Sequence, residues 1–133
     1  MIGEIFTYFF AYNTILKQND NYFVNKQMPE ELRPFVADQL SVPGTTTAIA
    51  KTMKNSPVQT FVNSYQKLGQ TGVQVGLIWG REDTIFPYEN SKILLEAVPQ
   101  ASLITIENAG HIPQYERAEE VTPALINFEK SFK

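Results

Sequence analysis

The stretch VQVGLIWGREDTIFP (residues 73–87) decides the fold, because an apolar segment changes at one glycine into a charged loop. Residues 73–79 predict a β-strand, and its final residues are nearly all apolar, as in a strand buried on both faces of a parallel sheet. The loop that follows Gly80 carries Arg81, Glu82 and Asp83. Since functional groups gather at the carboxyl ends of parallel strands, this loop is a candidate site.

Helical and strand patterns alternate after this loop. Residues 88–98 predict a helix that ends at Pro99, residues 102–106 a second strand, and residues 119–132 a closing helix. We expect Pro123 to fall in the first turn of that helix, or to restart it after Thr122. A crossover helix between two strands makes them parallel neighbours. The sequence therefore predicts an α/β fold with a short parallel β-sheet, in which two strands are recognisable, and flanking helices.

The part of the chain before Gly69 shows only helical spacing. Its clearest element is a helix over residues 57–68, which Ser56 can cap and which Pro57 can begin. The shorter helical pieces before it are broken by proline and glycine. We divide the chain into a helical segment, residues 1–55, and a strand-containing segment, residues 56–133.

A second candidate loop, NAGHIPQYE (residues 108–116), follows the second strand and contains His111, the only histidine. Neighbouring parallel strands lie about 4.8 Å apart, so we expect Asp83 and His111 to meet. A carboxylate beside an imidazole fixes its tautomer and stabilises the imidazolium, as in a nucleophilic triad. The alternatives are a histidine bonded only to backbone, an aspartate that caps a turn, and Glu82 as the carboxylate.

These two motifs, in this order and spacing, resemble the C-terminal part of an α/β-hydrolase over residues 73–132. The resemblance implies a partial α/β-hydrolase fold, with Asp83 as the catalytic acid and His111 as the catalytic base. It also implies that residues 1–55 are a helical cap that covers the active site and shapes a pocket for a small-molecule substrate. Which aromatic residue of the cap faces that pocket stays open among Phe6, Tyr8, Phe9, Phe10, Tyr12 and Tyr22. The alternative for these aromatic residues is core packing, or a patch that drives association.

The family's nucleophile elbow is missing from the 133 residues, since none of the serines stands in G-x-S-x-G and no aspartate takes its place. We interpret the chain as the C-terminal portion of an α/β-hydrolase, produced by truncation, an internal start or a split gene. The complete protein would hydrolyse an ester, epoxide, carbon–halogen or carbon–carbon bond, and this portion alone would have little or no activity. Whether the nucleophile is serine or aspartate stays open. The alternative is a non-catalytic binding or oligomerisation module derived from an α/β-hydrolase.

The amino-acid composition limits the classes of partner and cofactor that we expect. The net charge is −3, with 11 basic and 14 acidic residues in no long runs, so we expect neither nucleic acid nor a membrane surface as a partner. One histidine and no cysteine make a metal site unexpected, and no G-x-G-x-x-G supports a dinucleotide, so we expect no cofactor. The amino-terminal residues do not fit a signal peptide, and the lack of cysteine fits a cytoplasmic protein. We also expect a homo-oligomer, formed through the open edge of the strand at residues 73–79 or through the cap.

Overall fold

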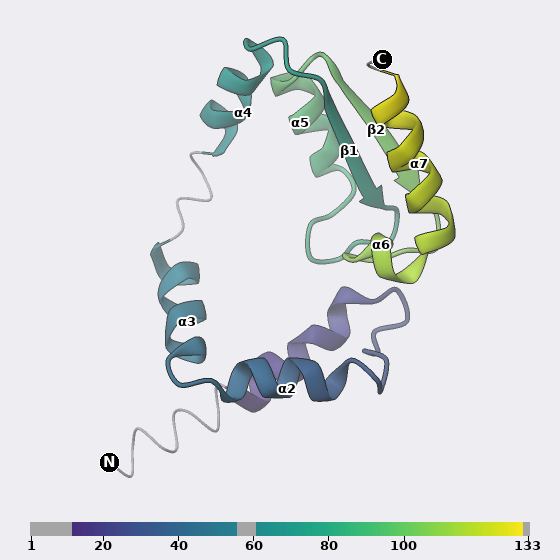
Figure 1. The fold of residues 1–133 in the computed structure, drawn as a ribbon. Coiled ribbons are helices and arrows are strands. Elements are labelled where there is room, and N and C mark those ends of the chain that lie inside the picture. Colours follow the sequence, from purple (N-terminus) through teal and green to yellow (C-terminus); the bar gives the residue numbers. More distant parts are fainter. Residues whose placement is uncertain (1–11, 56–60, 132–133) are drawn as a thin grey trace.

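The computed structural model of the chain describes residues 12–55 and 61–131 (Figure 1). Residues 12–18 are helical and continue into a short 3-10 helix, η1. The remaining elements follow in chain order, with a parallel sheet in the second half. The bounds are η1 Asn19–Tyr22, α2 Arg33–Ser41, α3 Thr45–Asn55, α4 Phe61–Gly69, β1 Val75–Gly80, α5 Asn90–Ala97, β2 Ala101–Ile106, α6 Pro113–Glu116 and α7 Ala118–Lys130.

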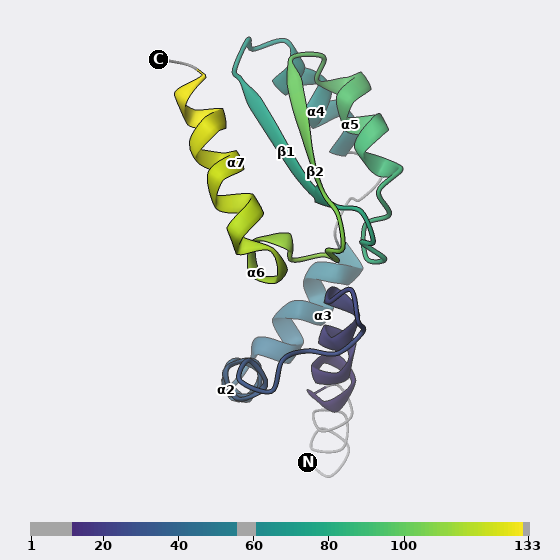
Figure 2. The same cartoon turned by 90° about the vertical axis from the view of Figure 1, so that its right-hand side faces the viewer.

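The two strands are parallel, with register from Val75 opposite Ala101 to Gly80 opposite Ile106. The crossover helix α5 joins them, which confirms the strand–helix–strand prediction. Helices α4 and α5 lie on one face of the sheet and α7 lies on the other (Figure 2). The strand-containing half is therefore a three-layer α/β arrangement, as the sequence predicts.

The strands are less buried than the apolar sequence suggests. The core cluster consists of Ile106, Ala109 and Val121, against which Ile78 and Ile104 pack. Along β1 only Gly80 is buried, and most of the other residues are half-buried. The expectation of burial on both faces therefore holds only in part.

The predicted start of α4 at Pro57 lies outside the described residues, and α7 differs from the sequence prediction. Helix α7 runs without a break through Pro123, so the expectation that this proline lies in the first turn or restarts the helix is wrong. Proline has no N–H to donate to the carbonyl of Glu119. The helix continues nevertheless, because Val121 is buried in the core and Phe128 packs against Gly76 of β1.

The helical first half lies beside the carboxyl ends of both strands (Figure 1). Phe23 and Met28 are its buried anchors between η1 and α2, with 4% and 1% of their surface exposed. Asp20 holds this segment by accepting hydrogen bonds from the Met28 amide and the Arg33 guanidinium, both at 2.9 Å. This placement is the one that a cap over the loops would need, and the boundary at residue 55 stays a prediction.

Candidate active site

Asp83 and His111 meet at the carboxyl ends of the two strands. Asp83 lies in the loop after β1 and His111 in the loop after β2, and Oδ2 of Asp83 is 2.9 Å from Nδ1 of His111. The Asp83 side chain is 6% exposed and the His111 side chain is 25% exposed. The prediction that these two side chains lie together is confirmed, and it follows from the parallel register of their strands.

The other oxygen of Asp83 fixes the direction of the carboxylate. Oδ1 accepts hydrogen bonds from the backbone N–H groups of Ile85 at 2.8 Å and Phe86 at 2.9 Å. These bonds form a tight turn immediately after the strand. Since both amides hold Oδ1, Oδ2 is left to face the imidazole. Asp83 therefore closes a turn, which was the alternative reading, and also orients the histidine.

The geometry around His111 determines which ring nitrogen is available. An ionised carboxylate can only accept a hydrogen bond, so Nδ1 of His111 donates to Asp83 and Nε2 carries the lone pair that can take a proton. Two aromatic rings, those of Tyr22 and Phe86, lie near the imidazole, each with its centroid 5.2 Å away. A cavity of about 170 Å³ adjoins this ring. It is lined by Ile78, Trp79, Gly80, Asp83, Phe86, His111 and Pro113.

The backbone before His111 is held by three different partners. The Ala109 amide donates to Glu82 Oε2 at 3.1 Å, the Gly110 amide to Glu116 Oε2 at 2.6 Å, and the His111 amide to the Tyr22 carbonyl at 2.7 Å. Glu82, the alternative carboxylate for the histidine, thus bonds to the loop backbone instead. Our sequence reasoning missed Glu116, although it is the last residue of the quoted motif.

Phe86 was also missed as a residue of the site. Its only signal in the sequence is its place three residues after Asp83. Of the aromatic residues named for the proposed cap, Tyr22 contacts the histidine and Tyr12 lies in the half-buried first helix. Phe6, Tyr8, Phe9 and Phe10 lie outside the described residues.

Arg81 anchors the loop after β1 from its outer side. Its guanidinium donates to Glu107 at 3.0 and 3.1 Å and lies 4.0 Å from the centre of the Tyr88 ring. The hydrogen bonds to Glu107 raise the pKa of Arg81. This residue ties the two loops together and does not face His111.

An apolar groove adjoins the histidine cavity and shares two of its residues, Trp79 and Phe86. It has a volume of about 410 Å³ and lies between α4 and α5. Several of its apolar side chains are exposed, including Phe61 at 43% and Ile93 at 49%. We call it the α4–α5 groove, and its residues are Phe61, Val62, Tyr65, Trp79, Phe86, Asn90, Ile93 and Leu94.

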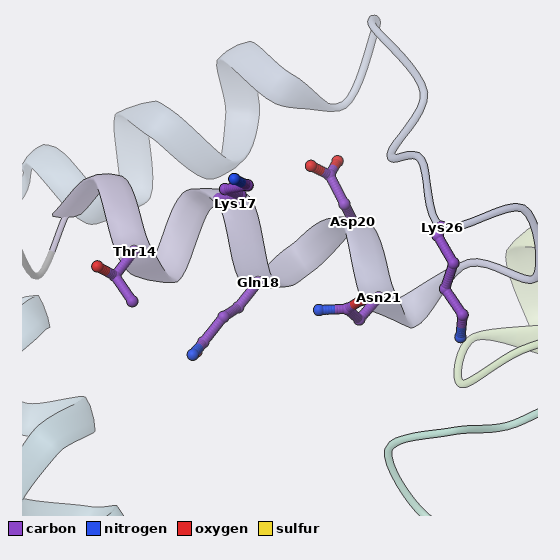
Figure 3. A pocket seen from close by; sticks show the side chains of 6 residues that line it. All are labelled: Thr14, Lys17, Gln18, Asp20, Asn21 and Lys26. Atoms are coloured by element: carbon purple, nitrogen blue, oxygen red, sulfur yellow. The ribbon is translucent and has the colours of Figure 1, made fainter.

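A third, polar pocket lies on the first helix and the turn after it. Figure 3 shows that its side chains point in different directions along the helix and do not converge on one point. Asp20 in this pocket already bonds to Met28 and Arg33. We therefore assign no ligand to this pocket. Its residues are Thr14, Lys17, Gln18, Asp20, Asn21 and Lys26.

Neither a metal site nor a membrane span emerges from the described part of the chain. Among residues 12–55 and 61–131, no three histidine, cysteine, aspartate or glutamate side chains are grouped closely enough to hold a metal ion. In the same ranges no helix combines the length and the apolar character needed to cross a bilayer.

Curated relatives share sequence with roughly half of the chain. A 2-hydroxy-6-oxononadienedioate/2-hydroxy-6-oxononatrienedioate hydrolase from Pseudomonas putida is 35% identical over 68 residues, which are 51% of this chain and 24% of the hydrolase. A hydrolase with the same substrate name from Dechloromonas aromatica is 28% identical over 78 residues, 59% of this chain and 27% of that protein. The chain thus spans about a quarter of the length of the curated relatives that it matches. No protein-family model matches the chain.

Solved structures match almost the whole chain. A meta-cleavage product hydrolase from Pseudomonas fluorescens, in complex with acetates, has a TM-score of 0.72 at 19% identity and covers 92% of this chain and 46% of its own. A bacterial membrane phospholipase A has a TM-score of 0.66 at 19% identity, with 90% and 37% covered. At these identities the structures show the fold alone. The chain therefore resembles the α/β-hydrolase family, and its architecture is a partial α/β-hydrolase fold.

Proposed function

We propose that this chain supplies the acid and the base of an α/β-hydrolase active site, with Asp83 as the acid and His111 as the base. The observation that supports it is the 2.9 Å contact between Asp83 Oδ2 and His111 Nδ1 at the carboxyl ends of β1 and β2. The chain order, acid before histidine, is the order of this family. The similarity to known hydrolases supports the proposal independently of the geometry of the site.

In this proposal His111 Nε2 removes the proton from an attacking group, and Asp83 stabilises the imidazolium that forms. Asp83 does not itself take the proton. No serine or aspartate of the 133 residues stands in a nucleophile elbow, so the attacking group would come from sequence beyond them. Without that group and an oxyanion hole, the chain alone would show little or no turnover.

Of the four bonds that the fold allows, we propose the carbon–carbon bond of a meta-cleavage product. The relatives with shared sequence are named for hydrolysis of 2-hydroxy-6-oxo dienedioates and trienedioates. Residues 1–55 would act as the cap over this small-molecule substrate, and Tyr22 of this segment would lie beside the chemistry, with its ring 5.2 Å from that of His111. A cytoplasmic location fits such an enzyme and belongs to the same proposal.

The gene provides the first test. We expect an in-frame G-x-S-x-G, or the equivalent with aspartate, upstream of Met1. The protein translated from the longest frame should hydrolyse a 2-hydroxy-6-oxo dienedioate, and His111→Ala should lower its kcat at least about 1,000-fold. Glu119→Gln, an exposed change in α7, is the matched control and should leave kcat unchanged. A promoter and stop codons directly upstream would contradict the proposal.

A direct assay of the 133-residue chain tests the proposed inactivity. The chain should not turn over activated esters above the background rate. Robust turnover that His111→Ala abolishes would show that the chain contains its own nucleophile.

The second candidate is a binding or oligomerisation module that no longer catalyses a reaction. The exposed apolar side chains of the α4–α5 groove favour this candidate, because monomeric proteins rarely expose a large contiguous apolar surface. This candidate and the first both lead us to propose self-association, through the groove and the open edge of β1 or through the cap.

A further inference from the structure

We infer that Glu116 is a positioning residue for His111, and that it does this by joining the histidine loop to the cap-like segment. The inference rests on the proposed function, in which His111 is the base. Glu116 itself touches neither Asp83 nor the imidazole in the contacts described above. Its effect would pass through the backbone that carries His111.

Each carboxylate oxygen of Glu116 binds a backbone amide from a different part of the chain. Oε1 accepts from the Val24 amide at 2.7 Å and Oε2 accepts from the Gly110 amide at 2.6 Å. Val24 follows η1, and Gly110 directly precedes His111. Both distances are short, as expected for amides that donate to an ionised carboxylate. Glu116 thus connects the segment after η1 to the histidine loop.

The segment after η1 and the backbone before His111 pack closely against each other. A Cβ atom on Gly110 would lie 2.6 Å from the Tyr22 carbonyl oxygen and 3.0 Å from the Phe23 carbonyl carbon. The His111 amide donates to the same Tyr22 carbonyl at 2.7 Å. The two backbones are therefore in direct contact, and Glu116 bonds to both sides of that contact.

The consequence for His111 is that the backbone which carries it is held in place. The imidazole can keep Nδ1 at 2.9 Å from Asp83 only while its own backbone stays in place. Loss of one amide partner would let Gly110 turn, and a displacement of even 1 Å at a catalytic group has large effects on rate. Any movement of the cap-like segment would also reach His111 through Glu116.

The single histidine makes this inference directly testable by NMR, because every imidazole signal belongs to His111. In the wild-type chain the ring should be the Nδ1–H tautomer, with the Nδ1 proton protected from exchange. Glu116→Gln should weaken this protection and mix the tautomers, because its amide offers one acceptor oxygen for two donors. Exchange of the Gly110 and Val24 amides should become about tenfold faster.

Two further variants separate this inference from the proposed function. Glu119→Gln removes the same charge from the neighbouring helix and should leave all these signals unchanged. Asp83→Asn should change the His111 tautomer and leave the Val24 amide protected. If Asp83→Asn has no effect on the tautomer, the proposed pairing of Asp83 with His111 is wrong. The inference that Glu116 holds the Val24 and Gly110 amides would then be judged by the exchange of those amides alone.

A measurement on the unsubstituted chain covers the case in which Glu116→Gln does not fold. Hydrogen exchange of the Gly110 and Val24 amides should be slow in this chain, because both amides donate to Glu116. Rapid exchange of both amides would overturn the inference. So would a folded Glu116→Gln chain in which the His111 tautomer and both amides behave as in the wild type.

Discussion

The two carboxylate oxygens of Asp83 have different hydrogen-bond partners, and substitutions can distinguish their contributions. Asparagine keeps an oxygen that can accept from the Ile85 and Phe86 amides, but it places an NH₂ group opposite His111 Nδ1. Alanine removes both functions. We expect Asp83→Ala to lower the free energy of unfolding by at least about 2 kcal/mol, and Asp83→Asn by less than half of that. Urea unfolding of the two variants checks this, and equal losses would contradict the role of Oδ1.

Gly80 allows the strand end to lie against the histidine loop. A Cβ atom there would lie 2.0 Å from the Gly110 carbonyl oxygen and 2.4 Å from that of Ala109, which are backbone atoms that cannot rotate away. We expect Gly80→Ala to cost about 3 kcal/mol of unfolding free energy, at the upper end for overpacking.

Gly76 of the same strand is the matched control for Gly80. Its Cβ would meet the Phe128 ring at 3.0 Å, and a side chain can move where a backbone cannot. Gly76→Ala should therefore cost clearly less in the same urea titration. If the two variants lose equal stability, the close approach of the loop to Gly80 does not explain the loss in Gly80→Ala.

The proximity of Asp83 and His111 could be predicted from sequence because each residue follows a recognisable strand. Parallel register then brings the two loops together, whatever the details of the loops. Glu116 and Phe86 could not be predicted in this way. Their positions depend on how the segment after η1 and the loop after β1 fold back, and those contacts join residues as far as 92 positions apart, as Val24 and Glu116 are.

At the scale of elements, the carboxylate of Asp20 holds the turn that places residues 22–28 against the histidine loop. The Met28 amide, with a further contribution from Arg33, holds the pKa of Asp20 below its ordinary value. A carboxyl with a lowered folded-state pKa stabilises the fold above its unfolded pKa, near 3.9. This stabilisation is lost as the pH falls through the lower, folded pKa.

Asp20→Asn should therefore reduce stability at neutral pH by up to about 1 kcal/mol. The difference from the wild type should shrink below about pH 4, since the wild-type carboxyl is then protonated as well. Chemical unfolding at a series of pH values measures this. Asp38→Asn on the exposed surface of α2 is the control and should show no such trend. A constant difference at all pH values would exclude an electrostatic cause.

Periodicity predicted the types of β1, α5, β2 and α7, but it predicted neither the short helix α6 nor the ends of the elements. The strand predicted at residue 73 begins at Val75, because Val73 is 54% exposed and pairs with no residue of β2. Pro123 misled the prediction of α7, since burial of Val121 outweighs one missing hydrogen bond. Such boundaries depend on tertiary contacts that a local pattern does not contain.

For the whole molecule, the main consequence of a two-stranded sheet is that an unpaired strand edge and apolar surface beside it stay exposed in the described part of the chain. Within the described residues β1 pairs only with β2, and the α4–α5 groove exposes apolar side chains beside it. The cap-like half exposes Phe35 of α2 at 69%. Both surfaces can drive association, and they lie at different ends of the molecule (Figure 1).

A substitution to lysine on each surface distinguishes between these two routes of self-association. A charge in an apolar contact disfavours association strongly, because burial of an unpaired ammonium is costly. We expect the chain to sediment as a dimer or larger at tens of micromolar, and Ile93→Lys in the α4–α5 groove to shift it toward the monomer by at least tenfold in dissociation constant. Phe35→Lys, at the other end, should leave the dissociation constant unchanged. The reverse result would assign the interface to the helical first half. A wild-type monomer at high concentration would exclude both surfaces as sites of self-association.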